Sequence, residues 1–259
     1  SIPVTSPKHL LTSAIASKSS VVSRIPSWTT ASNSPSCQVF SDPRKTHGEA
    51  ILYLVRYLKK TRDLGLKFKP NQNKGFECYC DADFSGNWNK EYAHKDPSTA
   101  KSRSGWIVFY AGCPVCWASK LQSQVALSTT GAEYIAMSMA LRDVIPIMNL
   151  LDELKTNDFQ VICTKPYVYC RVFEDNTGAV ELASSVKNPK MRPRTRHIST
   201  KYHHFRSKVQ DGTISIHQVS TEDMLADILT KVCNEQIQTK LRKQLMRWKL
   251  EDFVKRVRE

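Results

Sequence analysis

The chain has 259 residues, of which 41% are hydrophobic and 24% are charged, a composition typical of a folded protein rather than a disordered one. Its formal net charge of +14 favours a polyanionic partner, which is either nucleic acid or an anionic membrane surface. No run approaches the roughly 20 apolar residues of a membrane span, and no secretory signal opens the chain. Nucleic acid without a membrane is therefore the expected partner, and the protein is not expected outside the cell.

The first part of the chain predicts a leader followed by one helix. Residues 1–43 are rich in Ser, Thr and Pro and lack sustained periodicity, so we expect a disordered or poorly packed leader. From about Lys45 to Arg62, apolar residues recur at helical spacing and form one stripe that ends before Gly65. This amphipathic helix needs a partner surface, either downstream or in a preceding domain.

The region from Phe76 onward predicts a mixed α/β domain, because strand-like and helix-like patterns alternate along it. The runs at 105–110 and 115–121 flank a turn and predict a hairpin. The expected elements are strands at 76–84, 105–110 and 115–121, helices at 130–141 and 144–154, a strand at 167–174, helices at 176–185 and 197–211, a strand at 214–219, and helices at 222–230 and from 235 onward.

The eight cysteines are too few for a disulfide scaffold. Cys78 and Cys80 share one face of a predicted strand, and Cys113 and Cys116 form a C-x-x-C motif. A zinc site built from these two pairs is one alternative, although the spacings are not those of a zinc ribbon or finger. Buried, reduced thiols are the preferred interpretation.

Four acids lie where predicted elements begin or end, namely Asp81, Glu133, Asp175 and Asp227. Side chains so placed can converge on one edge of a sheet, where four carboxylates repel one another unless cations lie between them. Mg²⁺ suits such oxygen ligands, and two ions about 4 Å apart would support displacement at a phosphodiester. Each acid also has a structural explanation: Glu133 closes a capping box with Thr130, Asp175 caps the next helix, and the other two are solvated. Spacing alone leaves these alternatives open.

Short motifs follow one another in a fixed order between residues 42 and 232. They are DPRKTHGEAILYLVRYLKKTRDLGL (42–66), YCDADFSG (79–86), KSRSGW (101–106), VCWASKLQ (115–122), LSTTGAEY (127–134), EDN (174–176), RHISTKYH (196–203) and LADILTK (225–231). Each motif alone is a weak match. The ordered set resembles the ribonuclease H region that follows the reverse transcriptase in polyproteins of copia-type retrotransposons.

This resemblance implies an α/β (α+β) fold of ribonuclease H type, with a mixed five-stranded sheet flanked by helices and an N-terminal connecting helix. It implies a nuclease that cuts the RNA strand of RNA–DNA hybrids with two Mg²⁺ ions, which Mn²⁺ can replace. Asp81, Glu133, Asp175 and Asp227 would be both catalytic residues and metal ligands, and Asp83 is the reserve candidate. The implied protein partner is the reverse transcriptase domain of the same polyprotein, and the implied location is a cytoplasmic particle or the nucleus.

The expected organisation is a leader at 1–43, a connecting helix at 44–70, a ribonuclease H-like domain at 74–232 and a basic helical tail at 233–259. Basic residues gather between 187 and 208 without an acid among them. A role in phosphate contact is expected for these, with a solvated face as the alternative. The expected phosphate contacts are Lys187, Lys190, Arg192, Arg194, Arg196 and Lys201.

Several features depart from the family pattern. Ser199 and Val232 stand where the family usually has an acid and a proline, and residues 219–224 contain no counterpart of the catalytic histidine loop of cellular ribonucleases H. The paired-aspartate polymerase motif is also missing, so a complete reverse transcriptase is not expected. The main alternative is therefore a catalytically inactive remnant that only binds nucleic acid. An integrase-like nuclease is disfavoured, because its last acid would be a glutamate.

Overall fold

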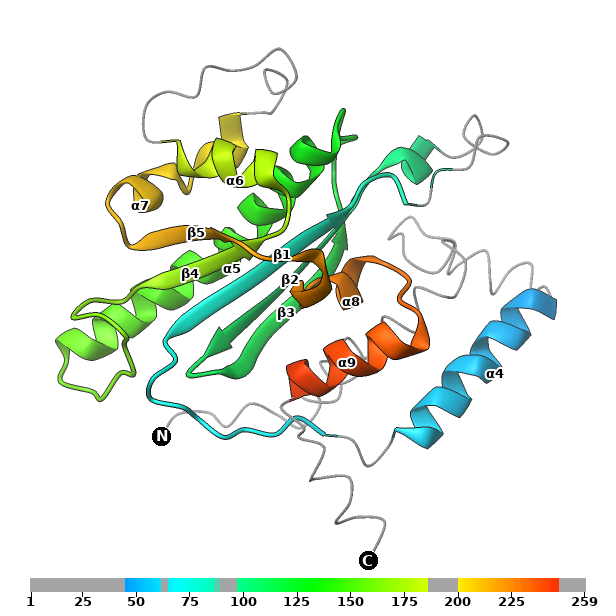
Figure 1. Ribbon diagram of the computed structural model, residues 1–259, viewed down its shortest axis with the longest axis horizontal. Helices are drawn as coiled ribbons and strands as arrows, with labels where there is room; N and C mark the ends of the chain where they lie inside the picture. The colour runs from blue at the N-terminus through cyan, green and yellow to red at the C-terminus, as the bar shows by residue number, and fades with distance from the viewer. Residues whose placement is uncertain (1–44, 62–64, 87, 89–96, 186–199, 247–259) are drawn as a thin grey trace, which may run out of the picture.

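A central five-stranded sheet organises the computed structural model, which describes residues 45–61, 65–86, 88, 97–185 and 200–246 (Figure 1). The strand order is β3-β2-β1-β4-β5. The pairs β1–β2 and β2–β3 are antiparallel, whereas β1–β4 and β4–β5 are parallel. The strands are β1 (Phe76–Asp83), β2 (Arg103–Tyr110), β3 (Cys113–Leu121), β4 (Cys170–Glu174) and β5 (Ile214–Gln218). This mixed sheet with its flanking helices confirms the predicted α/β fold class.

The helices lie before, between and after these strands. They are α4 (Lys45–Lys60), α5 (Thr129–Thr156), α6 (Thr177–Ser184), α7 (Arg206–Gln210), α8 (Asp227–Thr230) and α9 (Glu235–Met246), with short 3₁₀ helices at Pro97–Ala100, Thr200–His203 and Thr221–Asp223. On α4, Leu52 and Val55 are more than half exposed. The described residues thus leave part of the predicted apolar stripe uncovered. The predicted leader and the end of the predicted tail lie outside the described residues.

The larger core fills the space between the sheet and α5. Alternation along β1 directs Cys78 and Cys80 into it, and Trp106 on β2 donates a hydrogen bond from Nε1 to Asp143 on α5 at 2.9 Å. Contrary to the expectation from the sequence, α5 is long and apolar enough to pass as a membrane span, but half of its most apolar stretch is buried inside the protein. This burial is what a core helix packed on a sheet requires.

Pro146 lies inside α5 and does not divide it, so the prediction of two helices at 130–141 and 144–154 was wrong. Proline removes one helical hydrogen bond, which predicts a break in an isolated segment. Here Leu141, Val144 and Met148, on either side of the proline, are all buried in the core. Packing of one continuous face against the sheet outweighs the local penalty.

Two further predicted helices are shorter than expected. The segment 197–211 contains, in its described part, only a 3₁₀ turn and α7, and the segment 222–230 contains a 3₁₀ turn and α8. Each is interrupted next to a fully buried side chain, Phe205 in the first and Met224 in the second. Anchoring these residues in the interior bends the chain, a tertiary effect that helical periodicity does not encode.

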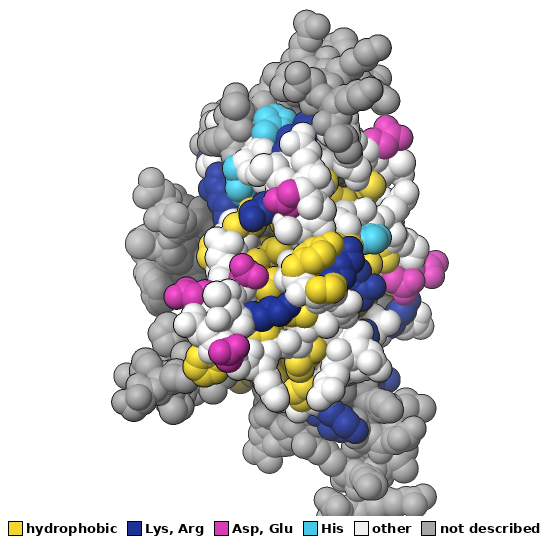
Figure 2. All heavy atoms as spheres, turned by 90° about the vertical axis from the view of Figure 1, so that its left-hand side faces the viewer, with side chains coloured by type: hydrophobic (Ala, Val, Ile, Leu, Met, Phe, Trp, Pro, Cys, Tyr) yellow, Lys and Arg dark blue, Asp and Glu magenta, His cyan; other side chains and the backbone are white. Residues whose placement is uncertain are grey.

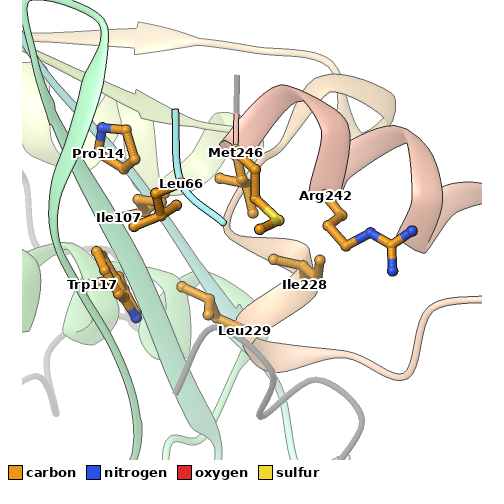
Figure 3. A pocket seen from close by; sticks show the side chains of 9 residues that line it. Leu66, Ile107, Pro114, Trp117, Ile228, Leu229, Arg242 and Met246 are labelled. Atoms are coloured by element: carbon orange, nitrogen blue, oxygen red, sulfur yellow. The ribbon is translucent and has the colours of Figure 1, made fainter. Parts of the chain in front are cut away.

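A smaller core lies on the opposite face of the sheet, under α8 and α9. Its buried members are Ile107, Phe109, Ile228, Leu229, Leu241 and Leu245. A small apolar pocket remains between the sheet and α9, with Ile107 and Trp117 on one side and Met246 on the other (Figure 3). This second core holds α8 against β1 and β2 and thereby fixes the position of Asp227.

Candidate active site

Asp81 is a fully buried carboxylate near the end of β1. Period-two alternation turns it away from α5 and toward α8. There the Thr230 hydroxyl donates a hydrogen bond to it, and the Lys231 ammonium lies 2.8 Å from its Oδ1. The end of α8 therefore supplies the partners that a buried charge requires.

Asp227 begins α8 and shares the same ammonium group. The Nζ atom of Lys231 lies 2.9 Å from Asp227 Oδ1, four residues along the chain. One lysine thus joins two carboxylates that are far apart in sequence. The sequence motif contained Lys231, but the prediction gave it no role.

Gly105 allows α8 to approach the sheet this closely. It pairs with Asp81 across β1 and β2. A Cβ at this position would lie 2.6 Å from Thr230 Cγ2 and 2.8 Å from Leu229 Cβ. Any side chain on Gly105 would therefore push α8, and Asp227 with it, away from Asp81.

Gly105→Ala is expected to destabilise the fold by about 1–3 kcal/mol, because the added methyl group overpacks the α8 contact. Gly48→Ala is the matched control, since a Cβ there meets nothing within 4 Å and alanine is favoured in a helix. Chemical denaturation of both variants measures the difference. Equal stabilities of the Gly105 and Gly48 variants would contradict the close approach of α8.

Glu133 reaches the site from the start of α5. The N-cap of this helix is Ser128, whose hydroxyl accepts a hydrogen bond from the Gly131 amide at 3.0 Å, so the capping-box explanation for Glu133 was wrong. Glu133 is only 7% exposed, and its Oε2 has no hydrogen-bond partner among the described residues. A buried oxygen without a partner is costly, which makes it a candidate ligand atom.

Asp175 follows β4 directly and does not cap α6, so the capping explanation for this residue was also wrong. Asn176 caps α6 instead, accepting a hydrogen bond from the Ala179 amide at 3.0 Å. Sequence reasoning missed the neighbouring Glu174, which is fully buried and accepts hydrogen bonds from the Asn176 amide at 3.2 Å and from Cys80 Sγ at 3.5 Å. An acid as the last residue of a buried strand was the available signal.

These carboxylates form two adjoining groups that share Asp175. Ligand oxygens of Asp81, Asp175 and Asp227 lie within 4.8 Å of one another, and so do those of Glu133, Glu174 and Asp175. The structure therefore brings all four predicted acids together and adds Glu174. Asp83, the reserve candidate, is half-buried and belongs to neither group.

Crowding raises the affinity of the acids for protons. Burial, followed by the charges of Glu174, Asp81 and Asp175, raises the pKa of Glu133. Burial raises the pKa of Glu174 and of Asp227, and the Asp81 charge adds to both shifts. Burial opposes the charge on Lys231, yet Asp81 and Asp227 outweigh it and raise the pKa of the ammonium group. The cluster therefore favours added positive charge, as either protons or cations.

The donor set fits a hard divalent cation. Carboxylate oxygens are the ligands that Mg²⁺ and Mn²⁺ prefer, and the unpaired Glu133 oxygen is available to one. Zinc at the cysteines is not supported, since no cysteine joins a group of metal-ligand atoms among the described residues. Burial raises the pKa of Cys78 and Cys80, which keeps their thiols protonated.

The predicted phosphate-contacting residues cannot be placed around this site. Lys187, Lys190, Arg192, Arg194 and Arg196 lie outside the described residues, as does the side chain of Lys201. Within the described part, Lys and Arg side chains adjoin hydrophobic ones in the middle of one face (Figure 2). Phosphate contact by the basic stretch therefore stays a prediction.

Comparison with known proteins finds relatives among mobile elements. The chain is 34% identical over 189 residues to the retrovirus-related Pol polyprotein from transposon RE2 of Arabidopsis thaliana, and 35% identical over 191 residues to that from transposon TNT 1-94 of Nicotiana tabacum. These matches cover 73% and 74% of this chain but only 12% and 13% of the relatives, so the chain spans about an eighth of their length.

Among solved structures, LC11-RNase H1 isolated from compost shares 18% sequence identity with this chain at a TM-score of 0.40. That match covers 64% of this chain and 98% of the solved one. No family model matches the chain.

Proposed function

We propose that the carboxylate cluster of this chain is the active site of a metal-dependent ribonuclease. The chain is a homologue of the copia-type retrovirus-related Pol polyproteins of transposons. The proposed reaction is hydrolysis of the RNA strand of RNA–DNA hybrids. The observation that carries the proposal is the convergence of the four predicted acids on two adjoining groups joined by Asp175. Residues from β1, α5, α8 and the end of β4 meet there. Helix-capping or solvated roles for the single acids do not explain why they meet.

The chain's own residues have distinct roles in this reaction. Asp175 belongs to both groups, so it would help to hold one ion together with Asp81 and Asp227 and another together with Glu133 and Glu174. The ions, when bound, would supply activation of a water molecule and stabilisation of the leaving oxygen. The protein holds the carboxylates in place beforehand, through the Thr230 hydroxyl on Asp81 and the Asn176 amide on Glu174.

Recognition of the hybrid is assigned to charge rather than to base sequence. The net charge of +14 attracts a polyanion. Hybrids have A-like geometry and are bound mainly through shape and phosphates. The one-signed basic stretch at 187–208 is the proposed contact surface, and a reverse transcriptase domain of the same polyprotein is the proposed protein partner.

A variant in which Arg192, Arg194 and Arg196 become glutamine is expected to weaken binding to hybrids of every sequence about equally. Lost phosphate contacts release fewer counterions, so the slope of log affinity against log salt should become shallower by roughly 0.7–0.9 per contact. Affinity measured across a salt series in EDTA gives this slope. If parent and variant have the same slope, these arginines form only a solvated face.

Cleavage of labelled substrates tests the proposed reaction. The purified chain should cut the RNA strand of a hybrid in Mg²⁺ and leave it intact in EDTA, with double-stranded RNA and DNA as controls. One observation favours the alternative of a binding-only remnant: the Lys231 ammonium already compensates Asp81 and Asp227. Binding of hybrid without cleavage in either Mg²⁺ or Mn²⁺ would establish the remnant instead.

A further inference from the structure

We infer that Lys231 is a built-in counter-cation that competes with a divalent ion for the Asp81–Asp227 side of the acidic cluster. The inference rests on the proposed function, since it concerns the cations that this function requires. It assigns Lys231 a regulatory role toward metal binding, separate from the reaction itself.

The geometry holds the ammonium group between two carboxylates. Its Nζ lies 2.8 Å from Asp81 Oδ1 and 2.9 Å from Asp227 Oδ1, while Asp81 itself is fully buried. The i,i+4 spacing to Asp227 fixes the lysine on the same side of α8. About a third of the Lys231 side chain is exposed, so its flexible stem has a route out of the site.

The two groups of acids differ in this respect. Lys231 forms ion pairs with two members of the group Asp81, Asp175 and Asp227. Among the residues that the structure describes, no lysine or arginine forms an ion pair with Glu133 or Glu174, and the Lys231 charge acts on Glu133 only from beyond ion-pair distance. A cation can therefore join the Glu133 side without displacing a charged group. A cation on the Asp81–Asp227 side must first displace the ammonium, because like charges at such short range repel strongly.

Two consequences follow from this asymmetry. In the metal-free protein Lys231 compensates the buried charge of Asp81, which stabilises the fold. When divalent ions are added, the same interaction lowers the apparent affinity of one of the two positions. The chain should therefore bind a first ion more tightly than a second.

The test compares Mn²⁺ binding to the full chain and to two variants by calorimetry, with Mn²⁺ alone and no nucleic acid. In Lys231→Met the weaker Mn²⁺ site is expected to tighten by about tenfold or more, since a competing unit charge is removed. Lys240→Met is the matched control, because Lys240 pairs at 3.2 Å with the exposed Asp223 outside the cluster. Its Mn²⁺ affinities should equal those of the parent. Unchanged or weaker binding to Lys231→Met overturns the inference.

Melting temperatures show whether Lys231→Met folds, and they also test the competition between Lys231 and Mn²⁺. Lys231→Met leaves Asp81 buried without its cation, so its melting temperature in EDTA should fall below that of the parent. Mn²⁺ should then raise the melting temperature of this variant by more than that of the parent. Lys231→Arg keeps the charge and should bind Mn²⁺ no more tightly than the parent does. An equal Mn²⁺ response in Lys231→Met and the parent contradicts the proposed competition.

Hybrid cleavage by the parent separates this inference from the proposed function. Tightened Mn²⁺ binding in Lys231→Met without cleavage by the parent supports the counter-cation role and rejects the nuclease. Cleavage by the parent without tightened binding in the variant supports the nuclease and rejects the counter-cation role.

Discussion

Asp175→Asn is expected to abolish hybrid cleavage while hybrid binding is kept or strengthened. Asp175 is the residue common to both carboxylate groups, so in the proposed site its loss would remove a ligand from two ion positions at once. The decrease should exceed the roughly 100-fold that the loss of a group hydrogen-bonded to a ligand typically costs. Binding should survive because removing a negative charge lessens repulsion of phosphate. Single-turnover cleavage and hybrid affinity in EDTA measure the two effects.

Asp152→Asn is the matched control for this variant, because Asp152 is an exposed residue of α5 outside the cluster. It undergoes the same chemical change and should cut like the parent. If Asp175→Asn also cuts at near the parent rate, Asp175 has no catalytic role. Helix capping would not explain the presence of Asp175 either, because Asn176 caps α6.

Glu133→Gln is expected to stabilise the metal-free fold by about 1–3 kcal/mol and, at the same time, to abolish cleavage. Glu133 is buried, one of its oxygens has no partner among the described residues, and its neighbours are acids. Its pKa is raised on folding, so a neutral amide avoids the free energy of taking up a proton. Cleavage is lost because the amide is a poor ligand for Mg²⁺ compared with a carboxylate. Denaturation in EDTA and cleavage in Mg²⁺ measure the opposite effects.

The pH dependence of stability provides a second check on Glu133. An acid whose pKa is raised on folding contributes its full stability below its unfolded pKa of about 4, and this stability is lost as the pH rises toward the folded pKa. For Glu174 the folded pKa is about 8. The metal-free parent should therefore lose stability from about pH 4 through neutral pH, and Glu133→Gln should lose less. Glu153→Gln, at an exposed position of α5, should follow the parent. Parallel profiles of stability against pH for Glu133→Gln and the parent would contradict the crowding of carboxylates around Glu133.

The sequence predicted the sheet and the convergence of the acids well, because both depend on local patterns. Alternation in β1 and the hairpin of β2 and β3 record which face of each strand is buried. The acids lie at element ends, and element ends meet at one edge of a sheet. Only the ordered motifs, however, indicate that the four acids form one site, because each acid alone is also explained by capping or by solvation.

Features that depend on packing between distant segments could not be predicted in this way. The continuity of α5 through Pro146 results from its contact with the whole sheet. The approach of α8 depends on the absence of a side chain at Gly105, more than a hundred residues earlier in the chain. The pairing of Lys231 with Asp81 follows from that approach. No periodicity within either segment encodes these contacts.

Anomalous diffraction from crystals of the chain soaked in Mn²⁺ shows directly whether the carboxylate cluster binds a metal ion. If the cluster is a metal-dependent active site, the anomalous difference density should show Mn²⁺ within coordination distance of Asp175, shared with Glu133 on one side and with Asp81 on the other. Absence of Mn²⁺ from both carboxylate groups at millimolar concentration, with the side chains ordered, would contradict a metal-dependent active site at this cluster.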